Sequence, residues 1–150
     1  MSSIFKEQLK QKDLEALSGE SHIAIIDDDP SFSIMLKDYL ISACDFNAEL
    51  FKNGEQFLSE YQKDDKRIIV LDYDFGKESS LNGLSILRAI KLKNPNACII
   101  MVSAQDDIEK ALETIRQGAT DYFLKTNKTV FANITTSIVK LLELERLKLN

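Results

Sequence analysis

The sequence predicts an α/β fold, in which a doubly wound, five-stranded parallel sheet carries helices on both faces. Short apolar runs, each long enough for one strand, alternate along the 150 residues with segments of helical period. Several runs are apolar at nearly every position, which is typical of strands buried on both faces. Acidic or polar residues follow the runs directly, at the strand ends where such sheets keep their ligand sites.

The amino-acid composition argues against several classes of function. The content of 44% hydrophobic and 29% charged residues is that of a globular domain, and a net charge of −5 argues against a nucleic-acid partner. No apolar run approaches the roughly 18 residues of a membrane span, and the N-terminus lacks the apolar core of a signal peptide. The two cysteines, Cys44 and Cys98, show no metal-binding spacing. We therefore expect a cytoplasmic chain that binds neither membrane nor nucleic acid.

The first 21 residues are predicted to lie outside the domain. Apolar residues are sparse among charges there, which is the pattern of a weakly amphipathic helix, and a Ser-Gly-Glu-Ser segment ends it. We therefore expect an N-terminal helical extension over 1–21 and one domain over 22–150, which closes with a long C-terminal helix.

The first half of the domain is expected to form two strands and two helices. A strand over 23–26 is followed by Asp29 and Pro30, the N-cap and first residue of a helix. The apolar face of this helix is expected to comprise Phe32, Met35, Leu36, Tyr39 and Leu40. A strand over 47–51, an Asn-Gly turn and a helix over 55–62 come next.

The third strand is the most informative element. Residues 68–71 read Ile-Ile-Val-Leu, and Asp72 follows at once. A strand buried on both faces cannot hold a carboxylate in its middle without a large desolvation cost. Asp72 is therefore expected where the strand emerges, at the carboxyl edge of the sheet.

The segment after Asp72 is expected to form a loop, a helix and a strand. The loop over 75–80 shows no apolar period, and Asn82 with Gly83 opens the helix. A second fully buried strand, over 97–102, then emerges at Ser103.

The last third is expected to add a helix, a short strand and the long final helix. Asp106 and Glu109 resemble a capping box, and Gly118 is the expected helix stop. Between them, the expected apolar stripe of the helix comprises Ile108, Ala111, Leu112 and Ile115. A strand over 122–124 ends at Lys125.

Polar groups thus arrive together at the carboxyl edge. The residues at these strand ends are Asp27, Asp28, Asp72, Asp74, Ser103 and Lys125. Converging carboxylates repel each other unless a cation lies between them, and Mg²⁺ prefers oxygen ligands from carboxylates and phosphates. A carboxylate can accept a phosphoryl group, while an ammonium and a hydroxyl stabilise the transferring oxygens. The set therefore predicts Mg²⁺-assisted phosphoryl transfer.

The order of these residues along the chain resembles that in the receiver domain of two-component response regulators. The resemblance covers about residues 21–144. It rests on the motifs Ile-Ile-Asp27-Asp28, Val-Leu-Asp72, Asn82-Gly83-Leu84, Ser103-Ala104 and Gly118 to Lys125. It implies a flavodoxin-like fold with strand order 2-1-3-4-5, as in the chemotaxis receiver of this family.

The resemblance also implies roles at the acceptor site. Asp72 would take a phosphoryl group from a phosphohistidine on a sensor histidine kinase or histidine phosphotransfer protein. The implied Mg²⁺ ligands are Asp28, Asp72, Asp27 largely through water, and the backbone carbonyl of Asp74. Lys125 would pair with the phosphoryl oxygens. Such a chain is mainly a signalling switch, which catalyses only its own phosphorylation and dephosphorylation.

The same resemblance implies how the switch is transmitted. Ser103 would move toward the new phosphoryl group and Tyr122 would follow inward. These two movements would bias a surface made of the fourth helix, fifth strand and fifth helix of the domain. Oligomers could form through that surface.

Three features depart from the family's usual pattern. Thr126 stands where proline usually follows the lysine, so we expect a trans bond before it, with a strained cis bond as the alternative. The loop before Gly83 is longer than usual, with Gly76 where proline is common, and we hypothesise that it alters partner recognition or phosphoryl lifetime. Asp74, with Gln105, could position or repel the hydrolytic water.

Parts of the sequence also resemble or allow three other functions. A strand ending in Asp-x-Asp resembles haloacid-dehalogenase-like phosphatases, in which Asp72 would be the nucleophile and Asp74 the general acid. That class needs acids beyond the lysine, where this chain has only Glu143 and Glu145, on the last helix. A nucleotide-binding module would need a glycine- or hydroxyl-rich loop after the first strand, where this chain has acids. A receiver that acts only as a binding scaffold is a third possibility, although every acceptor-site residue type is present.

Overall fold

Five parallel strands form the sheet in the order β2-β1-β3-β4-β5, as predicted. Their bounds are β1 (Ile23–Ile26), β2 (Ala48–Phe51), β3 (Ile68–Asp72), β4 (Ile99–Ser103) and β5 (Asp121–Leu124). The structure is a computed structural model and describes residues 22–76 and 81–148. The helical extension expected over 1–21 and most of the long loop before Gly83 lie outside the described residues.

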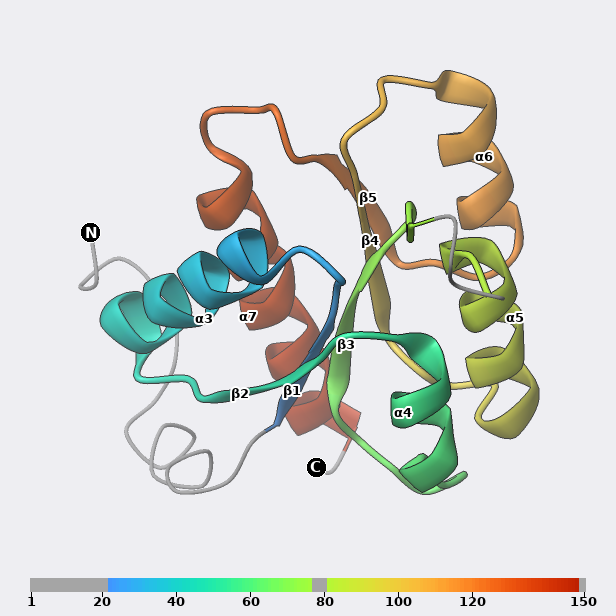
Figure 1. The fold of residues 1–150 in the computed structure, drawn as a ribbon. Helices are drawn as coiled ribbons and strands as arrows, with labels where there is room; N and C mark the ends of the chain where they lie inside the picture. Colours follow the sequence, from blue (N-terminus) through green and yellow to red (C-terminus); the bar gives the residue numbers. More distant parts are fainter. Residues whose placement is uncertain (1–21, 77–80, 149–150) are drawn as a thin grey trace.

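Helices cover both faces of the sheet (Figure 1). They are α3 (Pro30–Cys44), α4 (Gly54–Glu60), α5 (Gly83–Lys93), α6 (Ile108–Arg116) and α7 (Val130–Lys148). In Figure 1, α3 and α7 lie on one face, and α4, α5 and α6 lie on the other. The molecule therefore has the three layers of a doubly wound fold.

Two apolar layers hold the sheet between the helices. Successive residues of a strand point to opposite faces, so Ile25 and Val70 pack toward α3 and α7, while Ala24 and Ile69 pack toward α4 and α5. Every residue of β1, β3 and β4 is buried. Charged side chains can therefore reach water only where these strands end.

The register brings those ends to a common level. Asp72 pairs with Val102, one residue before Ser103. Ser103 in turn pairs with Leu124, one residue before Lys125. Because all the strands are parallel, residues that are far apart in the chain follow neighbouring strands at the same edge.

A glycine lets the end of β3 and the start of α5 approach closely. The N–H of Gly83 donates to the Tyr73 carbonyl at 3.0 Å, and the Asn82 side chain caps α5 by accepting the Ser85 N–H at 2.8 Å. A Cβ on Gly83 would lie 2.5 Å from the Asp72 carbonyl oxygen and from the Tyr73 Cα. No side chain fits there, which explains the Asn-Gly pair at this helix start.

Two of the predicted apolar stripes are not wholly buried. Met35, a member of the predicted apolar face of α3, is 57% exposed. On α6, Ile108 is 73% exposed, and Leu112 and Ile115 are also exposed, whereas Thr114 is fully buried. Apolar spacing identifies a stripe on a helix but not its direction. Helix α6 lies at the outer end of its layer, and its apolar stripe faces away from the sheet.

The predicted start of α6 is also corrected. The N-cap is Asp107 rather than Asp106, because the Asp107 carboxylate accepts the N–H groups of Glu109 at 3.0 Å and Lys110 at 3.2 Å. A turn closed by the Asp107 N–H and the Gln105 carbonyl, at 3.1 Å, delays the helix by one residue.

The backbone agrees with the other local predictions. Gly118 has a φ of +107° and follows α6, as expected of a glycine helix stop. No peptide bond of residues 22–76 and 81–148 is cis, so the Lys125–Thr126 bond is trans. Within the same ranges, none of the helices combines the length and apolar character that crossing a bilayer requires.

Candidate functional site

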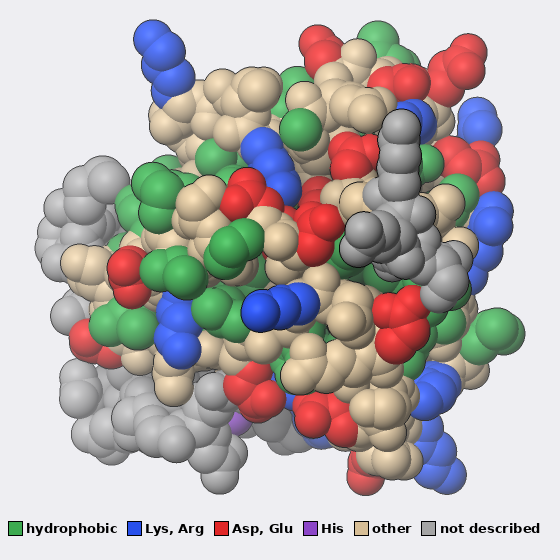
Figure 2. Space-filling view, viewed as in Figure 1, with side chains coloured by type: hydrophobic (Ala, Val, Ile, Leu, Met, Phe, Trp, Pro, Cys, Tyr) green, Lys and Arg blue, Asp and Glu red, His purple; other side chains and the backbone are tan. Residues whose placement is uncertain are grey.

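The strand ends bring three carboxylates and one ammonium group together. One carboxylate oxygen from each of Asp27, Asp28 and Asp72 lies within 4.8 Å of the others. The Lys125 Nζ lies 2.8 Å from Asp27 Oδ2 and 3.4 Å from Asp72 Oδ1. Figure 2 shows acidic side chains gathered over the ends of the strands, with a basic side chain beside them. The geometry is that of an oxygen-rich cation site next to a fixed positive charge.

Burial shifts the pKa values of the charged groups in this cluster. The side chains of Asp27 and Asp72 are only 2% and 3% exposed. Burial, followed by the charge of Asp27, raises the pKa of Asp72 to about 7, although Lys125 opposes the rise. Burial likewise raises the pKa of Asp27. Burial lowers the pKa of Lys125, but the two carboxylates outweigh this and leave the Lys125 pKa above its usual value.

The donor set fits a hard divalent cation. Two buried carboxylates and one exposed carboxylate share a single ammonium group, so negative charge remains uncompensated. Oxygen ligands of this kind suit Mg²⁺, which keeps several waters and needs few protein ligands. The exposed position of Asp28 leaves one side of the cluster open to water and to a ligand.

Backbone N–H groups hold each of the three carboxylates in place. Asp27 Oδ1 accepts the Asp29 N–H at 2.8 Å, and Asp72 Oδ1 accepts the Asp74 N–H at 3.3 Å. Asp28 Oδ2 accepts the Gly76 N–H at 2.9 Å. The Gly76 contact was not predicted, since 48 residues separate the partners and nothing in the local sequence marks it.

Ser103 and Asp74 are joined directly. The Ser103 hydroxyl donates to Asp74 Oδ2 at 3.0 Å and accepts the Gln105 N–H at 3.1 Å. The Gln105 carbonyl accepts from the Tyr122 hydroxyl at 3.4 Å, and its side-chain amide oxygen accepts from Lys110 Nζ at 2.7 Å. The predicted switch pair, Ser103 and Tyr122, therefore shares Gln105 as a neighbour.

Phe32 is a further member of the site that sequence reasoning treated only as core. The Lys125 Nζ lies 4.7 Å from the centre of the Phe32 ring, a distance typical of a cation–π contact. Phe32 belongs to the first turn of α3, which begins at the Asp29 cap. The ring and the two carboxylates together fix the direction of the lysine side chain.

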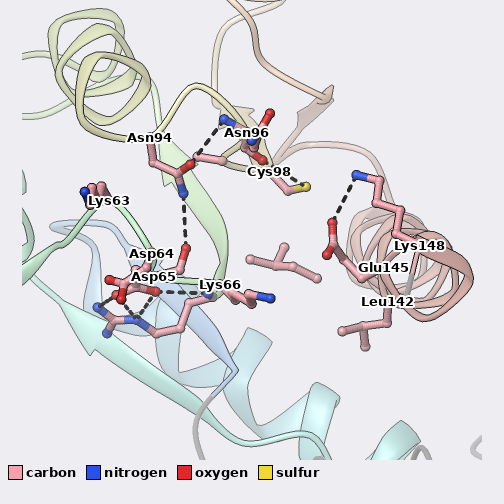
Figure 3. A pocket seen from close by; sticks show the side chains of 13 residues that line it. Lys63, Asp64, Asp65, Lys66, Asn94, Asn96, Cys98, Leu142, Glu145 and Lys148 are labelled. Carbon is pink, nitrogen blue, oxygen red and sulfur yellow. Dashed lines mark hydrogen bonds and ion pairs between the residues drawn. The ribbon is translucent and has the colours of Figure 1, made fainter. Parts of the chain in front are cut away.

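A separate pocket lies at the opposite, amino edge of the sheet (Figure 3). Its volume is about 330 Å³, and segments before β3 and β4 line it together with the end of α7. Arg67 pairs there with Asp65 at 2.7 Å, and Lys148 pairs with Glu145 at 3.2 Å. These two ion pairs compensate the charges of Arg67 and Lys148. The acidic cluster is therefore the stronger candidate site.

The region around the cluster matches a known family. A model of the family described as "Response regulator receiver domain" matches residues 23–135. The chain is 27% identical over 103 residues to the transcriptional regulatory protein ZraR of Escherichia coli K12. The aligned region covers 69% of this chain and 22% of ZraR. The chain is also 31% identical over 109 residues to MalR of Bacillus subtilis, and this alignment covers 69% of this chain and 43% of MalR.

A solved structure agrees in fold. The BeF3-activated receiver domain of DrrB, a Thermotoga maritima protein, superposes with a TM-score of 0.68 at 26% identity, over 81% of this chain and 96% of that domain. The chain spans less than half the length of ZraR and of MalR. The likeness therefore concerns one domain of those longer regulators.

Proposed function

The chain belongs to the response regulator receiver domain family, and from this premise we propose that Asp72 accepts a phosphoryl group from a phosphohistidine. The observation that supports the assignment best is the geometry around Asp72. Its buried carboxylate has Lys125 Nζ at 3.4 Å and two more carboxylates within 4.8 Å. This arrangement combines a nucleophile, a fixed positive charge and ligands for a cation at one strand end.

The proposed reaction is a single displacement. One Asp72 carboxylate oxygen forms a bond to phosphorus while the bond from phosphorus to the histidine nitrogen breaks, and the electron pair stays on that nitrogen. When bound by Asp27, Asp28, Asp72 and the Asp74 carbonyl, Mg²⁺ would supply positive charge to the phosphoryl oxygens. Water later hydrolyses the acyl phosphate, so the chain catalyses only its own phosphorylation and dephosphorylation.

Lys125 is proposed to change partners during this reaction. Its ammonium group is nearer to Asp27 than to Asp72 before phosphorylation, and it can reach an oxygen on the new phosphoryl group with a small shift. The Phe32 ring would stay beside the ammonium group during this shift, since the Lys125 Nζ lies 4.7 Å from the ring centre. A partner exchange of this kind places positive charge where negative charge is added.

Phosphorylation is proposed to alter the surface made by α6, β5 and α7. Ser103 and Tyr122 connect the acceptor to this surface through Gln105. The exposed apolar stripe of α6, with Ile108 and Leu112, supports this surface as a place for a partner or a second copy of the chain. Exposed apolar side chains that lie close together favour association, because association removes them from water.

The partners and the location follow from the same proposal. The phosphoryl donor is a sensor histidine kinase or a histidine phosphotransfer protein, and the chain itself contacts no nucleic acid, in keeping with its net charge of −5. We place the chain in the cytoplasm. Neither Cys44 nor Cys98 forms a disulfide in the described part of the chain, which suits a reducing compartment.

Two other functions are alternatives to the proposed one, and an experiment can distinguish them. A haloacid-dehalogenase-like phosphatase is not favoured, because the family match spans residues 23–135 and α7 carries the acids that follow Lys125. A binding scaffold that is never phosphorylated would keep the fold but not use the acceptor.

Intact-mass measurement distinguishes these functions. The parent, Asp72→Asn and the control Asp64→Asn, an acid near the amino edge of the sheet, are incubated with a small phosphodonor such as acetyl phosphate and Mg²⁺. The proposal expects a gain of one phosphoryl group in the parent and in the control but none in Asp72→Asn. No gain in the parent would favour the scaffold, and steady phosphate release from a phosphomonoester would favour the phosphatase.

A further inference from the structure

We propose that Asp74 is a latch that holds the Ser103 hydroxyl in the unphosphorylated arrangement and competes with the phosphoryl group for it. The inference rests on the proposed function and adds a positioning residue to it. Asp74 would act through Ser103 rather than on the reacting atoms. It would thereby set how readily the phosphorylated state forms.

The hydroxyl of Ser103 has one proton, and Asp74 already takes it. The donor and acceptor oxygens are 3.0 Å apart, and Ser103 is fully buried, so water does not compete for the contact. Hydrogen bonds to a carboxylate are shorter and stronger than those between neutral groups. The hydroxyl oxygen also accepts the Gln105 N–H at 3.1 Å, which leaves its single proton with Asp74.

A phosphoryl group on Asp72 needs that same proton. For Ser103 to donate to a phosphoryl oxygen, the hydroxyl must first leave the Asp74 carboxylate, because a hydroxyl has only one O–H donor. Each arrangement excludes the other. The strength of the Ser103–Asp74 hydrogen bond therefore subtracts from the stability of the phosphorylated arrangement.

Asp74 is also in direct contact with the acceptor. Its backbone N–H donates to Asp72 Oδ1 at 3.3 Å, while its side chain accepts from Ser103. One residue thus contacts the acceptor through its backbone and the hydroxyl through its carboxylate. A change at Asp72 reaches the latch without any intervening residue.

The latch extends to the proposed output surface. Gln105 donates its N–H to Ser103, and its carbonyl accepts from the Tyr122 hydroxyl at 3.4 Å. Lys110, on α6, donates to the Gln105 side chain at 2.7 Å. Releasing Ser103 from Asp74 would therefore loosen the contact that holds Tyr122 in its present position.

The first test needs no phosphorylation. Amide and tyrosine-ring NMR signals are compared in the parent and in Asp74→Ala, both without phosphodonor. The latch expects the Gln105 amide and the Tyr122 ring signals to shift in Asp74→Ala. The control Asp64→Ala, which changes an exposed acid near the amino edge of the sheet, should leave both signals in place. Unchanged Gln105 and Tyr122 signals in Asp74→Ala would overturn the latch, whatever the fate of Asp72.

The second test measures competition. Beryllofluoride with Mg²⁺ is the probe for the phosphoryl group, and its affinity is titrated in four proteins: the parent, Asp74→Ala, Ser103→Ala and the double variant. We expect Asp74→Ala to bind beryllofluoride about tenfold more tightly than the parent, as loss of one hydrogen bond to a charged group implies. In the Ser103→Ala background, the same change should alter the affinity by less than about twofold.

Simple charge repulsion predicts a different pattern. If Asp74 only repelled the anion, its removal would improve affinity equally in both backgrounds, and Asp74→Asn would match Asp74→Ala. That result would overturn the latch. The latch instead expects Asp74→Asn to lie between the parent and Asp74→Ala, because the amide still accepts the Ser103 proton without a full charge. A parent that gains no phosphoryl group in the mass experiment would count against the proposed function alone.

Discussion

Lys125 is bound more closely to Asp27 than to Asp72, the residue proposed to be phosphorylated. The Nζ distances are 2.8 Å and 3.4 Å, and both carboxylates are almost fully buried. The lysine therefore neutralises the pair as a whole before any phosphoryl group arrives. This arrangement makes the stability of the domain depend on the charges at its proposed site.

Removing the lysine charge should destabilise the domain. Lys125→Met leaves two buried carboxylates without their partner, and breaking such a buried pair costs about 3–5 kcal/mol. Addition of Mg²⁺ should restore part of this loss, since a cation can replace the ammonium group. Urea unfolding with and without Mg²⁺ measures both effects. A loss of stability that Mg²⁺ leaves unchanged would contradict the assignment of the cluster as a cation site.

Stability without Mg²⁺ should fall as the pH rises toward neutrality. Burial raises the pKa of Asp72 from its ordinary value of 3.8 to about 7 in the folded chain, so the folded chain binds more protons than the unfolded chain between these values. The stability that this proton provides is complete below pH 3.8 and is lost as the pH passes 7. At about 1.36 kcal/mol per pKa unit, the loss is on the order of a few kcal/mol.

Urea unfolding in EDTA at pH 5 and pH 8 tests this dependence. Asp72→Asn should show a smaller difference between the two pH values and should be more stable than the parent at pH 8. Part of the slope should persist in that variant, because burial also raises the pKa of Asp27. A parent that is at least as stable at pH 8 as at pH 5 would contradict the prediction.

Gly83→Ala should be strongly unfavourable. The new Cβ would lie 2.5 Å from backbone atoms of Asp72 and Tyr73, which cannot move aside as a flexible side chain could. We expect a cost of about 1–3 kcal/mol in thermal or urea unfolding, as for other overpacked sites. Gly76→Ala is the matched control, because its Cβ would only reach ordinary contact with Asp28 at 3.5 Å. Equal effects of the two substitutions would refute the packing argument.

The outward stripe of α6 should contribute little to stability. Leu112→Ala removes a side chain that is half exposed, and we expect a change below about 1 kcal/mol. The same substitution at Leu87, which is fully buried on α5, should cost about 2–5 kcal/mol. If Leu112→Ala were as costly as Leu87→Ala, α6 would have to pack with its apolar stripe inward.

Local sequence alone determined which segments are strands and where they emerge. The run from Ile68 to Leu71 is apolar throughout, so a carboxylate could follow it only at the strand end, and Asp72 is the last residue of β3. Asp29 with Pro30 and the stop at Gly118 act through backbone conformation and hydrogen bonds within a few residues. Convergence of the strand ends was predictable too, because parallel strands share one carboxyl edge.

Only the tertiary structure decided which side chains meet and which helix faces stay in water. Apolar spacing sets the relative phase of residues on a helix but not the rotation of that helix against the sheet, so the sequence did not reveal that the α6 stripe is exposed. The contacts from Asp74 to Ser103 and from Gly76 to Asp28 join residues 29 and 48 positions apart. Several acids of the sequence could accept a hydrogen bond from Ser103 or Gly76. The packing of the whole sheet determines which of them lies within reach.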